Sequence, residues 1–187
     1  MRKKDDEKRT SIKRAVLHII LDQGIHGASI SKIAKSAGVS PATLYIYYEN
    51  KDEMLKDIYQ EYAEEIFCHL LSQLNSQMTG EEFVDSLVRA YYKYITRYEE
   101  IYHFVELFES CPSLKQGCLE LAGPSKLNEL LIKYKQLGVI NDYETSNIWA
   151  ILLYPVKSIA KKSCTYKTSP EDQLNEMIQI IQKALLT

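Results

Sequence analysis

The stretch SPATLYIYYENK brings together polar and apolar side chains that suit a binding partner with both polar groups and apolar patches. Thr43, Tyr45 and Tyr47 supply hydroxyl groups. Ile46 supplies an apolar side chain, and Lys51 supplies a positive charge. Hydroxyl and ammonium groups donate hydrogen bonds to phosphate oxygens and base edges, and an apolar side chain can contact the methyl group of thymine. This combination favours recognition of a nucleic acid, provided that one element presents these side chains outward together.

The element that presents them is predicted to be a short helix. Ser40 is a favourable N-cap residue, and Pro41 suits the first helical position, where a missing N–H breaks no bond. A helix of about eight residues is unstable alone, so it must dock on another element. Leu44 and Tyr48 are four residues apart and share the docking face. At about 100° per residue, Ile46 then points away from that face, unless it packs against another helix.

A second short helix is predicted directly before this one. Ser29 can cap it, Ile33 and Ala34 lie on its inward face, and Gly38 ends it. Two short helices joined by a tight glycine-containing turn form a helix-turn-helix. In such a unit the first helix crosses the phosphate backbone and the second enters the major groove of DNA. This arrangement gives the outward face of the second helix a function.

The segment SISKIAKSAGVSPATLYIYYENKDEML resembles the DNA-binding domain of the TetR family of bacterial transcriptional regulators. The resemblance covers about residues 9–60. The matching motifs are Ile-Ala at residues 33–34, Ala-Gly-Val-Ser at 37–40, Thr-Leu-Tyr at 43–45, an aromatic pair at 47–48 and Asn-Lys at 50–51. Tyr48 departs from the pattern, because phenylalanine is commoner there. A buried tyrosine keeps the aromatic ring but needs a partner for its hydroxyl group.

The resemblance implies a set of DNA-contacting residues. In the family, recognition-helix tyrosines often contact phosphates, neighbouring positions vary with the operator, and a lysine at the start of the next helix holds a phosphate together with the helix dipole. The matching positions are Thr43, Tyr45 and Tyr47 for contacts to DNA, Pro41, Ala42 and Ile46 for operator-dependent positions, Lys51 for the phosphate, Ser31 and Lys32 for a second contact, and Ser40 at the cap. For both lysines, an ordinary exposed position is the alternative.

The charge is unevenly distributed along the 187 residues, whose net charge is −2. Residues 1–51 hold ten basic and five acidic residues, a net +5, and the remainder carries −7. A basic first quarter on an acidic body suggests a head that binds a polyanion. The basic residues nearest the N-terminus can add phosphate contacts or form a disordered, solvated tail; they are Arg2, Lys3, Lys4, Lys8 and Arg9.

Helical periodicity continues through the whole chain. An amphipathic first helix runs from Ile12 to about Gly24, and a long fourth helix opens at Asn50, with Glu53 three residues later as in a capping box, and reaches about Asn75. Further helices are predicted at about residues 81–97, 99–110, 113–121, 125–137, 143–163 and 170–186.

The expected fold is therefore all-α. It combines an N-terminal three-helix helix-turn-helix DNA-binding domain at residues 1–50 with a larger helical domain at residues 51–187. By the family resemblance, the larger domain would bind an effector and form a homodimer.

The larger segment is rich in aromatic residues at helical spacing, above all in residues 91–108. An aromatic-walled cavity with hydroxyl groups suits a planar or amphipathic ligand. The candidate ligand-binding residues are Phe67, Tyr94, Tyr98, Phe104, Phe108, Trp149 and Tyr154. The alternative is that these residues form plain core, in which case the protein regulates DNA without a small-molecule effector.

The last two predicted helices carry more apolar side chains than a one-sided surface helix needs. Two such helices from each subunit could pair across a twofold axis, with Pro155 kinking the first. The candidate interface residues are Ile148, Ile151, Leu152, Leu174, Met177, Ile178, Ile181 and Leu185. The alternative is that this wide stripe is buried inside one subunit.

These features predict a ligand-responsive repressor that binds a palindromic operator as a homodimer and is released by a small-molecule effector. No nucleophile–base pair and no phosphate-binding glycine loop is recognisable, so an enzyme is not expected. No cofactor and no metal site are expected, because the spacing of His103, Cys111 and Cys118 matches no standard site. No apolar run approaches the roughly 18 residues of a membrane span, so a cytoplasmic location is expected, with the four cysteines as small buried residues.

Overall fold

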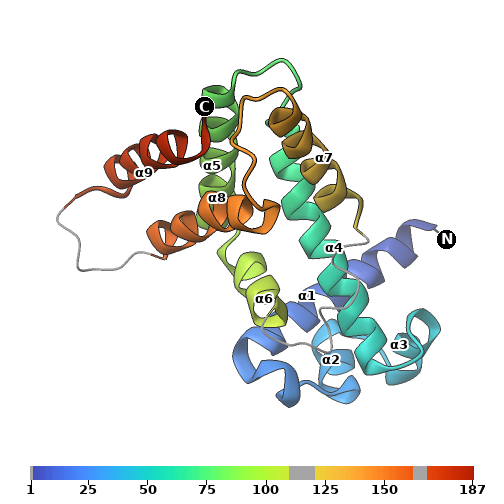
Figure 1. The fold of residues 1–187 in the computed structure, drawn as a ribbon. Helices are drawn as coiled ribbons and strands as arrows, with labels where there is room; N and C mark the ends of the chain where they lie inside the picture. The colour runs from blue at the N-terminus through green and yellow to red at the C-terminus, as the bar shows by residue number, and fades with distance from the viewer. Residues whose placement is uncertain (1, 110–120, 162–167) are drawn as a thin grey trace. The chain divides into compact units, whose positions relative to one another are not determined.

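The computed structural model describes residues 2–109, 121–161 and 168–187, and for residues 2–4 the backbone alone. Within these residues it contains nine α-helices and no β-strand, with one isolated β-bridge between Ile140 and Leu186 (Figure 1). The helices are α1 Arg2–Gly27, α2 Ile30–Ala37, α3 Pro41–Tyr47, α4 Lys51–Ser72, α5 Gly80–Arg97, α6 Glu99–Glu109, α7 Ala122–Gln136, α8 Thr145–Ala160 and α9 Pro170–Leu185. The all-α prediction is confirmed, whereas the helix predicted at 113–121 lies almost wholly outside the described residues.

The chain forms two compact units. The first contains residues 1–63 and 100–118, and the second contains residues 64–99 and 119–187. Helix α4 contributes its first part to one unit and its last part to the other. Each unit therefore has a core of its own.

The first unit is built around the helix-turn-helix. Helix α1 packs against α2, and α2 packs against α3, as Figure 1 shows in blue to cyan. Ile33 and Ala34 on α2 are buried, and so are Leu44 on α3 and Tyr48 directly after it. The inward faces of both short helices are therefore as predicted.

Side-chain caps fix where these helices begin. The Ser29 hydroxyl accepts the backbone N–H of Lys32 at 3.4 Å, and the Ser40 hydroxyl accepts that of Thr43 at 3.2 Å. Gly38 ends α2 at φ 69°, a left-handed conformation that glycine adopts without strain. These caps compensate for the low intrinsic stability of helices of only eight and seven residues.

The start of α4 carries the predicted capping residues in a modified form. The Asn50 side chain accepts the backbone N–H of Glu53 at 2.9 Å, as expected. The Glu53 carboxylate reaches back to the N–H of Glu49 at 3.0 Å, one residue earlier than in a standard capping box.

Helix α1 is longer than predicted. It begins at Arg2 and not at Ile12, so the interpretation of the N-terminal segment as a disordered tail is wrong. Asp5 lies in the first turn, where the helix dipole favours a negative charge, and the Thr10 hydroxyl bonds the backbone of Asp6. Gly24 departs from helical geometry at φ 71°, near the predicted end, but helical structure resumes to Gly27.

The second unit is organised around α5. This helix packs against α8 and α9, which also pack against each other (Figure 1). A full capping box opens α5, because the Thr79 side chain accepts the N–H of Glu82 at 3.2 Å and the Glu82 carboxylate accepts that of Thr79 at 2.8 Å. In the described part of the chain, no helix is both long and apolar enough to cross a membrane.

Candidate DNA-binding surface and ligand cavity

Helix α3 presents its outward face to solvent. Leu44 is 1% exposed, whereas Ile46 is 78% and Tyr45 57% exposed. Pro41 and Ala42 are also exposed. An isoleucine this exposed loses the stabilisation of burial, so its position fits a partner outside the first unit better than that unit's core.

Two hydroxyl groups at the start of α3 are bonded to each other. The side-chain oxygens of Ser40 and Thr43 lie 2.9 Å apart, and Ser40 also caps the helix. Whichever of the two hydroxyl groups donates in this pair, the O–H of the other remains to be donated elsewhere. Ser40 and Thr43 can therefore hold the helix and still contact DNA.

The two predicted phosphate-binding lysines both contact the turn before α2. The Lys51 Nζ atom donates to the carbonyl oxygen of Ala28 at 3.2 Å. Lys32 Nζ donates to the carbonyl oxygen of Gly27 at 2.9 Å and to the side chain of Gln23 at 2.6 Å. Since an ammonium group has three donors, both lysines keep capacity for a phosphate.

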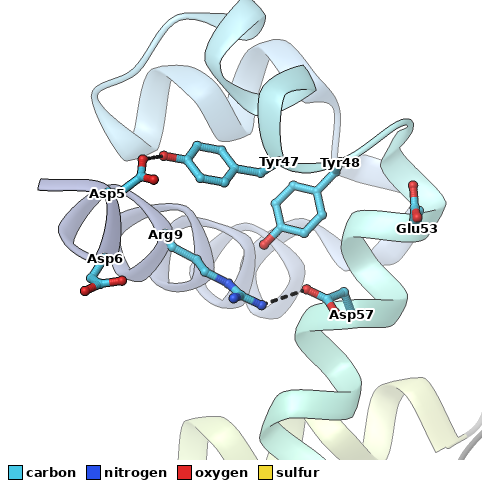
Figure 2. Close-up of a pocket in the computed structure, with 7 residues that line it drawn as sticks. All are labelled: Asp5, Asp6, Arg9, Tyr47, Tyr48, Glu53 and Asp57. Carbon is cyan, nitrogen blue, oxygen red and sulfur yellow. Dashed lines mark hydrogen bonds and ion pairs between the residues drawn. The ribbon is translucent and has the colours of Figure 1, made fainter. Parts of the chain in front are cut away.

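Tyr47 is half-buried and directed toward the N-terminal turn of α1. Its hydroxyl group donates a hydrogen bond to the carboxylate of Asp5 (Figure 2). This bond, assisted by partial desolvation and by the charges of Asp5 and Asp6, raises the pKa of the Tyr47 phenol. The two bonded residues are 42 positions apart, and no local sequence pattern links Asp5 to the recognition helix.

Tyr48 lies beside Tyr47 in a cavity of about 410 Å³. Its hydroxyl group is buried and has no hydrogen-bond partner among the described residues. Burial raises the pKa of this phenol, although the adjacent Arg9 guanidinium favours the phenolate. Arg9 thus lies close enough to act on this phenol, but within the described residues no hydrogen bond of standard geometry satisfies the hydroxyl group. The cavity is lined by Asp5, Asp6, Arg9, Tyr47, Tyr48, Glu53 and Asp57.

Ion pairs connect α1 with α4 at this cavity, and Arg9 and Asp57 are among its lining residues. The Arg9 guanidinium donates to the Asp57 carboxylate at 3.2 Å and pairs with Glu61. Lys13 lies 3.3 Å from the other oxygen of Glu61. Arg9, considered in the sequence as a phosphate contact, is thus an anchor between two helices. The i, i+4 spacing of Asp57 and Glu61 is the signal that could have indicated this.

A second cavity of about 410 Å³ lies in the second unit. Trp149 donates its indole N–H to the Asn128 side chain at 3.3 Å, which fixes the aromatic wall on α8 to α7. The cavity lining holds no charged side chain, and its exposed wall is mainly apolar. The lining residues are Phe67, Pro124, Ser125, Leu127, Asn128, Thr145, Ser146, Trp149 and Leu153.

The structure separates the seven predicted ligand-binding residues. Phe67 and Trp149 line the second cavity. Phe104 and Phe108 are fully buried in the first unit, where Phe108 stacks on Tyr59 at 5.4 Å between ring centroids. The others do not line this cavity: Tyr94 is buried against His69 and Tyr98, Tyr98 is partly exposed and Tyr154 is 67% exposed.

The predicted interface residues also fall into two groups. Most are buried within the second unit, namely Ile148, Leu152, Leu174, Ile178, Ile181 and Leu185. Met177 is half-buried and Ile151 is 37% exposed. Two apolar neighbours outside the predicted set, Tyr154 on α8 and Ile180 on α9, are 67% and 51% exposed. The exposed apolar surface of α8 and α9 is therefore narrower than the predicted stripe.

The cysteines offer little for a metal or redox site in the described residues. Cys68 is exposed and its thiol contacts the Glu64 carboxylate at 3.7 Å, so the prediction of a buried cysteine is wrong there. Cys111, Cys118 and Cys164 lie outside the described residues. Within those residues, no three His, Cys, Asp or Glu side chains are grouped as metal ligands.

Known proteins with related sequences are regulators. Residues 14–58 match the family described as "Bacterial regulatory proteins, tetR family". The chain is similar to the fatty acid metabolism regulator protein of Bacillus subtilis, with 26% identity over 134 residues, which is 72% of this chain. The chain spans 64% of that relative's own length.

Solved structures share the fold over nearly the whole chain. A TetR family transcription regulator from Marinobacter aquaeolei superposes with a TM-score of 0.85 at 21% identity, covering 100% of this chain and 99% of that one. The transcriptional regulator FadR from Bacillus subtilis, solved in complex with stearoyl-CoA, gives a TM-score of 0.73 at 20% identity, covering 94% and 98%. Residues 14–58, which contain the helix-turn-helix, therefore form a domain of the tetR family of bacterial regulatory proteins, and the whole chain shares the all-α fold of the solved structures.

Proposed function

We propose that this protein is a ligand-responsive transcriptional repressor that binds a palindromic DNA operator as a homodimer. Residues 1–50 would form the DNA-binding domain, and residues 51–187 the effector-binding and dimerisation domain. The observation that carries the proposal is the outward face of α3, where Ile46 and Tyr45 are exposed above the buried Leu44. Because its partner would be chromosomal DNA, we expect the protein to act in the cytoplasm.

Each part of the DNA-binding surface has a proposed role. Ile46, together with the exposed residues Pro41 and Ala42, would read bases in the major groove. Tyr45, Tyr47 and the Ser40–Thr43 pair would reach phosphates or base edges, and Ser31, Lys32 and Lys51 would hold the phosphate backbone. No step of this function needs catalysis or a metal, so we propose a regulatory and not an enzymatic role.

The second cavity is the proposed effector site. Its volume of about 410 Å³ and its mainly apolar wall suit a small amphipathic or apolar compound. The similarity to FadR, which was solved with stearoyl-CoA, makes a long-chain acyl compound the first class to test. An effector can weaken DNA binding only if it binds the DNA-incompatible conformation more tightly.

A regulator without an effector is the second candidate. It is supported by the burial of Tyr94, Phe104 and Phe108, which makes much of the predicted aromatic cluster plain core. In that case no acyl compound would raise the melting temperature of the protein, whereas a true ligand must raise it.

The surface offered to a second subunit is the exposed apolar face of α8 and α9. Ile151, Tyr154 and Ile180 carry it, and the buried residues behind them would hold the two helices together. A twofold dimer would place two recognition helices on half-sites about one helical turn apart.

Selection from a random duplex pool tests the central proposal. The protein is expected to enrich a palindromic sequence, because two identical heads read two identical half-sites. Enrichment of no sequence over several rounds, at a salt concentration where weak binding survives, would contradict the role as an operator-binding regulator.

A further inference from the structure

The Tyr47 hydroxyl group already has an acceptor on its own chain. It donates to the carboxylate of Asp5 in the first turn of α1, and the two side chains face each other in Figure 2. We propose that Asp5 is an internal competitor of DNA, which occupies Tyr47 in the free protein and thereby lowers the affinity for DNA. This inference rests on the proposed contact between Tyr47 and a DNA phosphate.

The competition follows from the number of hydrogens. A phenol has one O–H group, whereas ionised carboxylates and phosphates only accept hydrogen bonds. The Tyr47 hydroxyl therefore cannot donate fully to Asp5 and to a phosphate at the same time. Binding the phosphate requires that the bond to Asp5 first be broken, and charge-assisted bonds of this kind are the stronger ones.

The charge around Tyr47 acts in the same direction. Asp5 and Asp6 are both exposed and negative, and both would face an approaching phosphate. Arg9, the basic residue in the lining of this cavity, is paired with Asp57 and Glu61 on α4. Its positive charge is thus partly neutralised, and a phosphate entering beside Tyr47 would meet a net negative surface.

The simpler explanation gives Asp5 a structural role only. An acidic residue in the first turn stabilises a helix through its dipole, and a bond to Tyr47 would tie α1 to α3. On that explanation, removal of the charge at Asp5 would loosen the DNA-binding head and weaken DNA binding. The competitor role predicts the opposite sign, so one substitution separates the two.

The test uses the full-length chain and a short fluorescent DNA duplex of random sequence at low salt. Such a duplex is sufficient, because phosphate contacts do not depend on sequence. Asp5→Asn keeps the size of the side chain and removes its charge, and we expect about 3- to 10-fold tighter binding by fluorescence anisotropy. Asp6→Asn is the matched control, since it removes the same charge from the adjacent residue, which forms no bond with Tyr47. We expect a gain of about 2-fold or less there.

A double-mutant cycle with Tyr47→Phe then locates the effect. If Asp5 acts through the hydroxyl group, Asp5→Asn in the Tyr47→Phe background should gain no more than Asp6→Asn does. Equal gains for the two aspartates in the wild-type background, or a full Asp5→Asn gain without the hydroxyl group, would overturn the inference. If Tyr47→Phe alone leaves binding unchanged, the phosphate contact itself is wrong, which is a failure of the proposed function.

A measurement without DNA checks the contact by itself. With tyrosine labelled at Cζ, NMR titration of Tyr47 should show a lower phenol pKa in Asp5→Asn than in the wild type, and a smaller decrease in Asp6→Asn, which removes a nearby charge but no hydrogen bond. Circular dichroism should show that both variants keep their helices. An unchanged Tyr47 titration in a folded Asp5→Asn variant would show that the bond is absent in solution and would remove the basis of the inference.

Discussion

The ammonium group of Lys51 lies 3.2 Å from the carbonyl oxygen of Ala28 and donates a hydrogen bond to it. Ala28 is in the turn between α1 and α2, so the first residue of α4 stabilises the backbone directly before the helix-turn-helix. Lys32 bonds the neighbouring carbonyl oxygen of Gly27 at 2.9 Å. Both proposed phosphate contacts are therefore preorganised by the turn, which lowers the entropy lost when they bind DNA.

Replacing Lys51 with alanine should weaken binding to every DNA sequence. Loss of one phosphate contact makes the plot of log K against log salt concentration less steep, by about 0.9 in slope. It does not change which DNA sequence is preferred. Anisotropy titrations of a selected operator and of a random duplex over a salt series measure both effects. Lys56→Ala is the matched control, because Lys56 is an exposed lysine farther along the same helix. A Lys51→Ala slope equal to the wild-type slope would show that Lys51 serves only the turn.

Replacing Ile46 with alanine should change which bases are preferred. Since Ile46 is 78% exposed, the variant should keep its stability to within about 0.5 kcal/mol. Its preference at one or two base pairs of the half-site should relax by about 1 kcal/mol each, as measured by repeating the selection from a random pool. Leu44→Ala contrasts with it, because loss of this buried side chain should cost about 2–5 kcal/mol of folding stability. Equal affinity losses on all sequences for Ile46→Ala would contradict a role in reading bases.

The orientation of α3 was predictable because the information is local. Ser40 and Pro41 fix its start, and the four-residue spacing of Leu44 and Tyr48 fixes its inward face, so the outward position of Ile46 follows from helix geometry. The same holds for α9, which begins at Pro170 with Ser169 as N-cap, where the helix was predicted to start. Caps and periodicity act within a few residues, and the sequence displays them directly.

Contacts between distant residues were not predictable in the same way. Asp5 and Tyr47 are 42 residues apart, and nothing in the spacing of either indicates the other. Periodicity likewise placed Phe108 on the apolar stripe of its helix. It did not show that Phe108 stacks on Tyr59, or that Trp149 lines a cavity. A helical pattern identifies the buried face of an element, whereas the tertiary fold decides which neighbour covers it.

Ligand binding should be visible in the fluorescence of Trp149, the only tryptophan of the chain. An acyl compound that enters the cavity would replace water beside the indole, shift its emission to shorter wavelength and raise the melting temperature. Ser146→Phe, which places a large side chain in the cavity lining, should abolish both responses while DNA binding persists. Tyr154→Ala is the control, because Tyr154 is exposed on the same helix but does not line the cavity. Responses that survive Ser146→Phe would place the ligand elsewhere.

Replacing Tyr48 with phenylalanine should stabilise the protein. Its buried hydroxyl group has no partner in the described structure, and such a group costs about 1–3 kcal/mol, so the variant should gain about 1 kcal/mol. Tyr134→Phe is a control with the opposite expected sign, because the Tyr134 hydroxyl donates a hydrogen bond to the carbonyl oxygen of Met78 at 2.7 Å. Its removal should lower the free energy of unfolding by about 1 kcal/mol. Urea denaturation at neutral pH measures both changes. A loss of stability in Tyr48→Phe would mean that the hydroxyl group has found a partner in solution.

The same phenol should also affect the alkaline limit of stability. Burial raises the pKa of Tyr48 in the folded state, so the fold favours its protonated form. Its contribution is fully present below the unfolded-state pKa of about 10 and is lost as pH rises through the higher folded-state value. Tyr48→Phe should therefore lose less stability than the wild type between neutral pH and that alkaline range. Parallel stability curves for the two proteins would show that Tyr48 does not titrate differently on folding.

Replacing Ile180 with glutamate should convert the proposed dimer into monomers. Ile180 is 51% exposed on α9, which packs against α8, the helix that carries the exposed Ile151 and Tyr154. A charge in the centre of an apolar interface is expected to cost at least about 2 kcal/mol of association energy. Sedimentation velocity should show the halved mass. Operator affinity should fall with it, because two separate heads no longer share one binding event. Leu137→Glu is the control, since Leu137 is 64% exposed after α7 and lies outside α8 and α9. A mass unchanged by Ile180→Glu but reduced by Leu137→Glu would move the interface from α8 and α9 to the end of α7.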